Sequence, residues 1–248
     1  MRTRTLVCFS AAFLALLLPP AWAAAAGLQV TPLRVHLSAD SPAGALTLRN
    51  HGDRPRVIQA EVVRWTQEAG EDVHADTEDV LVTPPIFTLE PGESQVVRMG
   101  YTAGNGEAGA AIEQAYRIYL QESPPPDEAE GAQLQLLLRL GVPLFIAPEG
   151  REQTALQWTV EPLAEGGLEI RAANQGNVHT LIQELRVAAG TPDSDERRVA
   201  TLGTHRYLLP GQASSWHIDR ETDWRGTGSL DLSALTPRGA LNAEIDLE

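Results

Sequence analysis

The chain has 248 residues, a formal net charge of −14 and a single cysteine. The acidity argues against a nucleic-acid partner, because binding to phosphates requires a basic face. A chain of this length suits one large or two small domains, each able to bury a core.

The first residues have the pattern of a secretory signal peptide. Two arginines precede an apolar run over 6–18, and Ala21-Trp22-Ala23 supplies small residues at a cleavage site. The apolar run is shorter than a membrane-spanning helix requires. We therefore expect residues 1–23 to be removed on export, with no membrane insertion. Cys8 leaves with them, so the mature chain has no cysteine.

Short runs of alternating hydrophobicity follow, separated by Gly, Pro, Asn and Asp. Such spacing is typical of an immunoglobulin-like sandwich, which we expect over 24–148. The candidate strands are Leu28 to Leu37, Ala45 to Asn50, Val57 to Gln67, Val80 to Leu89, Ser94 to Tyr101, Gln114 to Glu122 and Gln133 to Ala147.

Pro148-Glu149-Gly150 has the composition of a hinge, and a second set of candidate strands follows it. No stretch beyond the signal peptide carries a sustained helical period. We therefore predict an all-β chain with a second sandwich over 149–248. Its candidate strands are Leu156 to Val160, Gly167 to Asn174, Ile182 to Ala188, Arg198 to Leu202, His205 to Leu208, Ser214 to His217, Ser229 to Leu235 and Ala240 to Leu247.

The last strand of the first domain alternates strictly. Leu134, Leu136, Leu138 and Leu140 fall on one face, because successive side chains of a strand point to opposite faces. A row of large aliphatic side chains is either a core face of this sandwich or a strand offered to another protein. The pattern alone leaves both interpretations open.

The sequence offers no catalytic or metal-binding constellation. Gly104 to Gly109 matches GxGxxG, but the sequence after it favours a strand, not the helix of a dinucleotide site. The six histidines share no metal-ligand spacing. We expect no enzymatic activity, no nucleotide, no metal and no cofactor.

Several stretches resemble the PapD-like periplasmic chaperones of fimbrial (chaperone–usher) assembly. They are LQVTPLRVHLS, LVTPPIFTLEPGESQVVRMGY, YRIYLQESPPP, LQLLLRLGVPLFIAP and YLLPGQASSW. The VPLF sequence is most similar to that of the archaic (sigma-type) branch. The resemblance implies two immunoglobulin-like sandwiches in an L-shaped arrangement, located in the periplasm. It implies binding of pilin subunits and delivery to an outer-membrane usher. The alternative is a structural pilus subunit or adhesin with immunoglobulin-like domains.

The resemblance also implies functional residues. The leucine row would be the strand lent to the subunit, a form of β-augmentation. Arg34 matches a basic residue that anchors the subunit's C-terminal carboxylate, a role suited to a bidentate guanidinium. A second anchor, often lysine, is replaced by Pro143, and Arg117 is the candidate substitute. The Thr83–Pro84 bond is expected to be cis, as in relatives.

Overall fold

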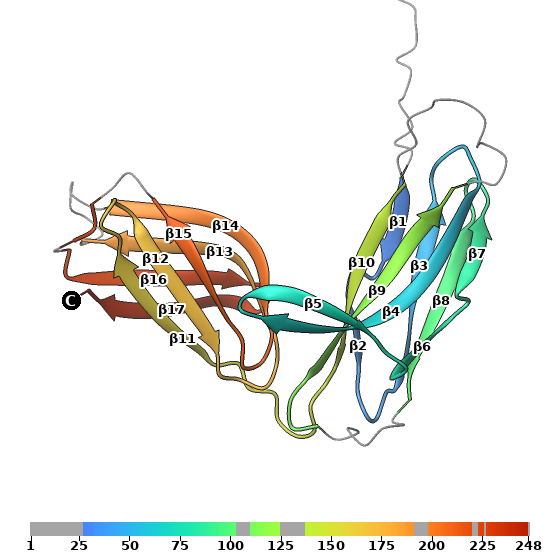
Figure 1. The fold of residues 1–248 in the computed structure, drawn as a ribbon, viewed down its shortest axis with the longest axis horizontal. Helices are drawn as coiled ribbons and strands as arrows, with labels where there is room; N and C mark the ends of the chain where they lie inside the picture. Colours follow the sequence, from blue (N-terminus) through green and yellow to red (C-terminus); the bar gives the residue numbers. More distant parts are fainter. Residues whose placement is uncertain are drawn as a thin grey trace, which may run out of the picture.

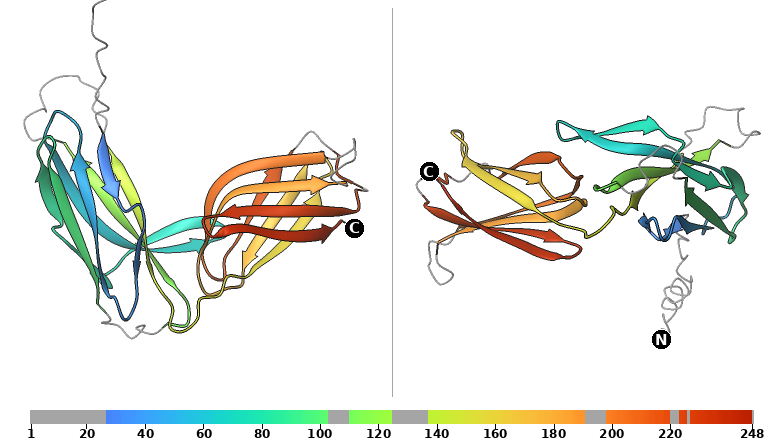
Figure 2. Two further views of the ribbon diagram at one scale, coloured as in Figure 1. Left: turned by 180° about the vertical axis from the view of Figure 1, so that it is seen from behind. Right: turned by 90° about the horizontal axis from the view of Figure 1, so that it is seen from below.

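The computed structural model describes residues 27–102, 110–124, 137–190, 198–219, 223–225 and 227–247. All regular structure in these ranges is β-strand, arranged as two sandwiches that meet at an angle (Figure 1). Views from behind and below show that the contact between them is confined to one end of each sandwich (Figure 2). The predicted all-β, two-sandwich, L-shaped fold is confirmed.

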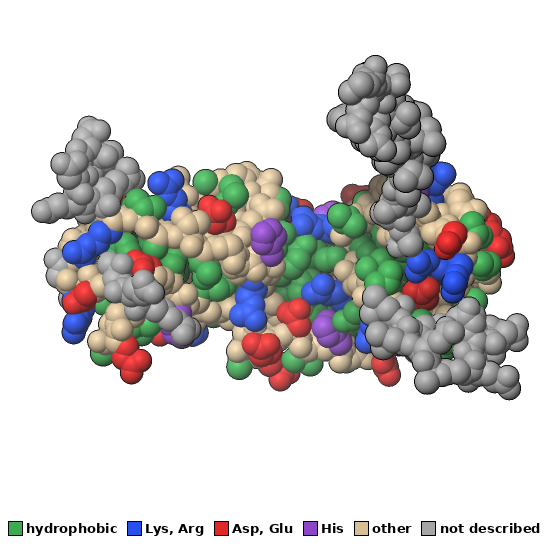
Figure 3. Space-filling model, turned by 90° about the horizontal axis from the view of Figure 1, so that it is seen from above, with side chains coloured by type: hydrophobic (Ala, Val, Ile, Leu, Met, Phe, Trp, Pro, Cys, Tyr) green, Lys and Arg blue, Asp and Glu red, His purple; other side chains and the backbone are tan. Residues whose placement is uncertain are grey.

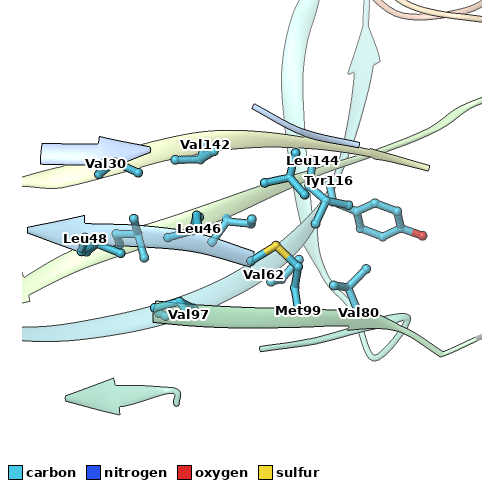
Figure 4. Packing of buried hydrophobic residues seen from close by; sticks show 14 of the residues in the cluster. Val30, Leu46, Leu48, Val62, Val80, Val97, Met99, Tyr116, Val142 and Leu144 are labelled. Carbon is cyan, nitrogen blue, oxygen red and sulfur yellow. The ribbon is translucent and has the colours of Figure 1, made fainter. Parts of the chain in front are cut away.

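The first sandwich consists of two sheets that enclose one apolar core. One sheet has the order β1(Leu28–Thr31), β3(Ala43–Asn50), β8(Ser94–Tyr101), β6(Val80–Thr83). The other has the order β2(Val35–Leu37), β10(Arg139–Ile146), β9(Gln114–Ser123), β4(Arg56–Glu68), β5(Glu71–Asp76), and β7(Ile86–Leu89) pairs with β4. Side chains from β10, β3 and β8 fill the space between the sheets (Figure 4).

The predicted strand from Leu28 to Leu37 is wrong as a single strand. The chain turns at Pro32 to Arg34, so that β1 pairs with β3 in one sheet and β2 pairs with β10 in the other. The predicted strand from Val80 to Leu89 likewise divides at Pro84 into β6 and β7. Proline explains both interruptions, because it removes a backbone donor and fixes φ. The Thr31–Pro32 and Thr83–Pro84 bonds are both cis.

The second sandwich packs a smaller sheet on a larger one. The smaller has the order β11(Leu156–Pro162), β12(Leu168–Asn174), β15(Ala213–Ile218), and the larger β14(Arg198–Leu208), β13(Thr180–Ala189), β16(Ser229–Thr236), β17(Gly239–Asp246). The two strands predicted between Arg198 and Leu208 form the single strand β14. Its pairing with β13 shifts register between Ile182 and Glu184, an irregularity that a bulge absorbs.

Stability of the first sandwich should depend on its core and not on its outer faces. Leu46 is 1% exposed, whereas Leu81 on the outer face of the same sheet is 62% exposed. We expect Leu46→Ala to lower the free energy of unfolding by about 2–5 kcal/mol, through lost burial and a residual cavity. Leu81→Ala should change it by less than about 0.5 kcal/mol. Urea denaturation followed by tryptophan fluorescence measures both, and equal losses would contradict this assignment of the core.

Candidate functional site

The cleft between the sandwiches is closed at its base by a small apolar cluster. Trp65 of β4, Ala115 of β9 and Phe145 of β10 pack against Leu209 of the second sandwich, and Tyr207 of β14 covers the cluster. The ring centroids of Trp65 and Tyr207 lie 5.3 Å apart in an edge-to-face arrangement. This interdomain cluster occupies the junction. Seen from above, apolar side chains with basic and histidine side chains around them lie where the two sandwiches meet (Figure 3).

Hydrogen bonds hold the two sandwiches together beside this cluster. The buried side chain of Gln67 donates to the Tyr207 carbonyl at 2.9 Å and accepts from the Leu209 amide at 3.0 Å. On the other side, the Glu113 amide donates to the Asn177 carbonyl at 2.9 Å. These bonds stabilise one relative orientation, because leaving buried polar groups unpaired carries a desolvation penalty.

A stack of rings continues the junction on the side of β2. His179 of the second sandwich lies parallel to Phe145, with centroids 3.7 Å apart, and the His36 ring lies 5.7 Å from Phe145 and 6.1 Å from His179. Glu113 approaches His179 Nδ1 at 2.5 Å, and both side chains are buried. The stack therefore joins ionisable groups of both sandwiches in one buried contact.

Three arginines line the cleft, and each lies against an aromatic ring. Arg34 donates to the Tyr207 hydroxyl at 2.9 Å through an Nη atom and at 3.2 Å through Nε. The Arg117 guanidinium carbon is 4.0 Å from the Trp65 ring centroid. The Arg139 carbon is 3.8 Å from that of Tyr119. Stacking on aromatic rings favours a cation electrostatically and limits its rotamers.

The predicted strand of alternating leucines ends at an unpaired edge of β10. β9 pairs with β10 along all of Arg139 to Ile146, but β2 pairs with it only from Leu144 to Ile146. Within the described chain, no strand therefore pairs with the other edge of Arg139 to Pro143. An exposed row of backbone donors and acceptors is a template for an incoming strand.

The described leucines of this row are Leu138 and Leu140. Leu138 and Leu140 are partly buried, and Leu140 packs against the first core, whereas Leu137 and Arg139 on the opposite face are exposed. Leu134 and Leu136 lie outside the described residues. In the described half of the row, Leu140 thus packs on the core, and the leucines remain partly accessible to solvent.

The two predicted carboxylate anchors lie on either side of Pro143. Arg34 precedes Val35, which pairs with Leu144, so Arg34 is level with Pro143 on the β2 side. Arg117 is the direct partner of Pro143 on the β9 side. Arg117 also donates to Asp72 at 3.1 Å, and its Nε is buried with no hydrogen-bond partner among the described residues.

Sequence reasoning missed the second sandwich's contribution to the cleft. Tyr207 lies in a strand pattern that gives no sign of a partner far away in sequence, and only the packing of the domains brings it to Arg34. Glu71 and Asp72 belong to β5, which is missing from the predicted strands, and the hairpin of β5 with β4 reaches the second sandwich through Gln67. Alternation in 71–76 was the available signal.

Other predicted sites add little to this geometry. The GxGxxG match at Gly104 to Gly109 lies outside the described residues. Among the described residues, no group of three or more His, Cys, Asp or Glu side chains is placed to hold a metal ion. The described ranges also contain no helix long and apolar enough to cross a membrane.

Comparison with known sequences places the chain in a family of assembly chaperones. The family model described as pili and flagellar-assembly chaperone, PapD N-terminal domain, matches residues 27–152. The chain is also similar to the chaperone protein FimB/FhaD of Bordetella pertussis. The two are 32% identical over 227 residues, which cover 84% of this chain and 88% of the relative.

Comparison with solved structures shows the same fold. The chain resembles a chain of the CsuC–CsuE chaperone–tip adhesion subunit complex of Acinetobacter baumannii, with a TM-score of 0.63, 19% identity and coverage of 90% and 98% of the two chains. It resembles one from the SafA pilin–SafB chaperone complex of Salmonella enterica, with a TM-score of 0.59, 16% identity and coverage of 89% and 96%. At these identities the likeness concerns the fold alone.

The ring stack should make the junction sensitive to acid. Partial burial lowers the pKa of His36, and electrostatic interactions with His179 and Arg34 lower it further, whereas the carboxylates of Glu113 and Glu152 raise it. The folded state thus binds this proton more weakly than the unfolded state does. The resulting stability is complete above the unfolded pKa of about 6.5 and is lost as pH falls toward the folded value.

We expect the free energy of unfolding to fall between pH 7.5 and pH 5.5, and to fall less in His36→Gln. Urea denaturation at constant ionic strength measures the difference. His217→Gln, at an exposed position on β15, is the matched control and should retain the wild-type pH dependence. An unchanged dependence in His36→Gln would refute the contribution of His36.

Proposed function

Because this chain belongs to the PapD-like family of pilus- and flagellar-assembly chaperones, we propose that β10 is the strand it lends to pilin subunits. As a chaperone of this family it is not an enzyme. It acts in the periplasm, binds pilin subunits and delivers them to an outer-membrane usher. The observation that carries the proposal is the unpaired edge of β10 at Arg139 to Pro143.

Pilin subunits of this pathway are incomplete immunoglobulin folds that lack their last strand, as the family relationship implies. Their exposed groove needs backbone partners and large apolar side chains. The edge of β10 offers the backbone groups, and Leu134, Leu136, Leu138 and Leu140 offer the side chains. Each leucine that becomes fully buried contributes about 1.5–3 kcal/mol before ordering costs. Such a row retains a subunit without nucleotide hydrolysis.

Arg34 and Arg117 are proposed to bind the subunit's terminal carboxylate. The chain contains no lysine, so a permanently charged basic anchor in the cleft must be arginine. Pro143 lies between the two guanidinium-bearing positions and places no charged group there. Tyr207 supports the assignment of Arg34, because its hydroxyl accepts from Arg34 without neutralising the guanidinium.

The domain limits are also part of the proposal. We assign residues 1–23 to a cleaved signal peptide, 24–148 to the first domain with the lent strand, and 149–248 to the second. The first described strand starts at Leu28, and the gap between β10 and β11 spans 147–155. Gly150, with φ of 84°, lies in this gap at a conformation that suits glycine.

We further assign the chain to the archaic branch of the family. The support is the VPLF sequence at 142–145 and the absence of lysine at Pro143. Sequencing of the neighbouring genes tests this assignment. An adjacent usher gene of the archaic type supports it, whereas an adjacent usher of the classical type contradicts it.

If β10 and the leucine row before it are lent to the subunit, the effect of a substitution on subunit capture should depend on which face of the strand carries it. Leu138→Glu places a charge on the face that enters the subunit, and it should reduce recovery of a co-expressed pilin at least tenfold. Leu137→Glu, one residue earlier on the opposite exposed face, should retain most recovery. Affinity purification from periplasm measures the recovery of a one-to-one complex, and circular dichroism checks folding.

Equal capture by these two variants would contradict the lent strand. Polymerisation of the purified chain would instead favour the alternative, a structural pilus subunit or adhesin.

If Arg34 anchors the carboxylate, its substitution should weaken subunit binding without unfolding the protein. Arg34→Ala removes a charge-assisted contact to the carboxylate, and subunit binding should weaken about tenfold to a hundredfold. Arg34→Lys, which keeps the charge but not the bidentate geometry, should be intermediate. Arg49→Ala, on an exposed face of β3, is the matched control. Full binding by Arg34→Ala would remove this residue from the site.

A further inference from the structure

Arg139 is a basic residue of the cleft for which the proposed anchor has no role. Its guanidinium carbon lies 3.8 Å from the centroid of Tyr119, whose hydroxyl is 3.4 Å from His74 Nε2. The side chain is exposed, and it forms no ion pair with any residue in the described ranges. Arg117, which pairs with Pro143 four strand positions nearer the junction, is instead paired with Asp72.

The strand is shaped to hold Tyr119 beneath Arg139. Gly141 is the direct partner of Tyr119 in the β9–β10 pairing. A Cβ atom on Gly141 would lie 3.2 Å from Tyr119 Cε1 and 3.4 Å from Arg117 Cδ. The missing side chain therefore lets the ring and the Arg117 stem lie close against β10. Arg139 consequently stacks on a ring that is itself positioned by close packing.

Arg139 and Arg117 place two positive charges near His74, in a chain whose net charge is −14. Burial lowers the pKa of His74, and the nearby charges of Arg117 and Arg139 lower it further, against the opposing carboxylate of Asp72. Arg117 contacts Asp72 and is already assigned to the terminal carboxylate, so Arg139 is the arginine of this group with neither an anchor role nor an ion-pair partner among the described residues. A basic side chain without an acidic partner, beside an edge proposed to bind a strand, favours an acidic group on the incoming strand.

The strand register fixes where that acidic group must lie. This step rests on the proposed function, in which the subunit's terminal carboxylate binds at Arg34, level with Pro143. The rest of the subunit strand then runs back along the open edge, parallel to β10. Arg139 is four residues before Pro143, about 13 Å along the strand, and its side chain is on the same face.

We propose that Arg139, held on Tyr119, binds an acidic side chain four residues before the C-terminus of the subunit. Residues on adjacent strands at the same level and on the same face are close enough for opposite charges to interact. Arg139 thereby selects subunits by charge at a point separate from the carboxylate anchor. It is a specificity-determining residue of the cleft.

Synthetic peptides of eleven residues test this selection. Valine occupies the even positions, serine the odd positions, and the last residue carries a free carboxylate. One peptide has glutamate at position 7, the fourth before the last, a second has glutamine there, and a third has glutamate at position 3. Fluorescence anisotropy measures the Kd of each for the mature chaperone.

The position-7 glutamate peptide should bind about three to ten times more tightly than the other two, an effect of the size of a partly exposed ion pair. Arg139→Gln should abolish this preference, and 0.5 M NaCl should reduce it. Arg98→Gln is the matched control, because Arg98 is exposed on the outer face of the other sheet of the first sandwich and should leave the preference intact.

The outcomes separate this inference from the function on which it rests. Equal binding of the three peptides, with affinity still dependent on Arg34, would overturn the role of Arg139 alone. A preference that persists in Arg139→Gln would also overturn it. Binding that does not depend on Arg34 or on a free terminal carboxylate would contradict the proposed anchor, and failure of every peptide to bind would contradict both.

Discussion

The short parallel pairing between β2 and β10 is the constraint on which the cleft depends. It covers only Leu144 to Ile146, because the chain enters the other sheet as β1 and crosses over at Pro32 to Arg34. Had the first strand stayed in one sheet, it would cover β10 along its length. The crossover leaves the edge at Arg139 to Pro143 without a partner, and it places Arg34 beside the end of that edge.

An unpaired edge with apolar side chains is a hazard for a secreted protein, and the surroundings of β10 limit it. Leu140 retains contact with the first core, so the strand is partly buried even without a partner. Pro143 has no N–H to offer, and Arg139 adds a charge to the exposed face. These features reduce indiscriminate pairing, while the leucine row remains suited to a groove that needs alternating apolar side chains.

The junction between the sandwiches gives the cleft its geometry. Gln67 and the ring stack around Phe145 join residues from both sandwiches, and Tyr207 reaches across to orient Arg34. The guanidinium groups lie against aromatic rings, which attract a cation and restrict its rotamers. In the proposed mode of binding, recognition of the subunit's end relies on residues of both domains, although the proposed lent strand belongs to the first.

The sequence by itself determined the strand content, the two-sandwich plan and the leucine alternation, because period-2 patterning and turn residues act locally. The family resemblance also indicated Arg34 and Arg117 as candidate anchors, which remains a proposal. The tertiary structure alone decided that Leu28 to Leu37 divides between sheets, that Glu71 to Asp76 forms a strand, and that Tyr207 contacts Arg34. These features depend on strand pairing and domain packing between residues far apart in the chain. A local sequence pattern carries no information about such partners. The sequence therefore could not predict the open edge of β10 or the stacking of Arg139 on Tyr119.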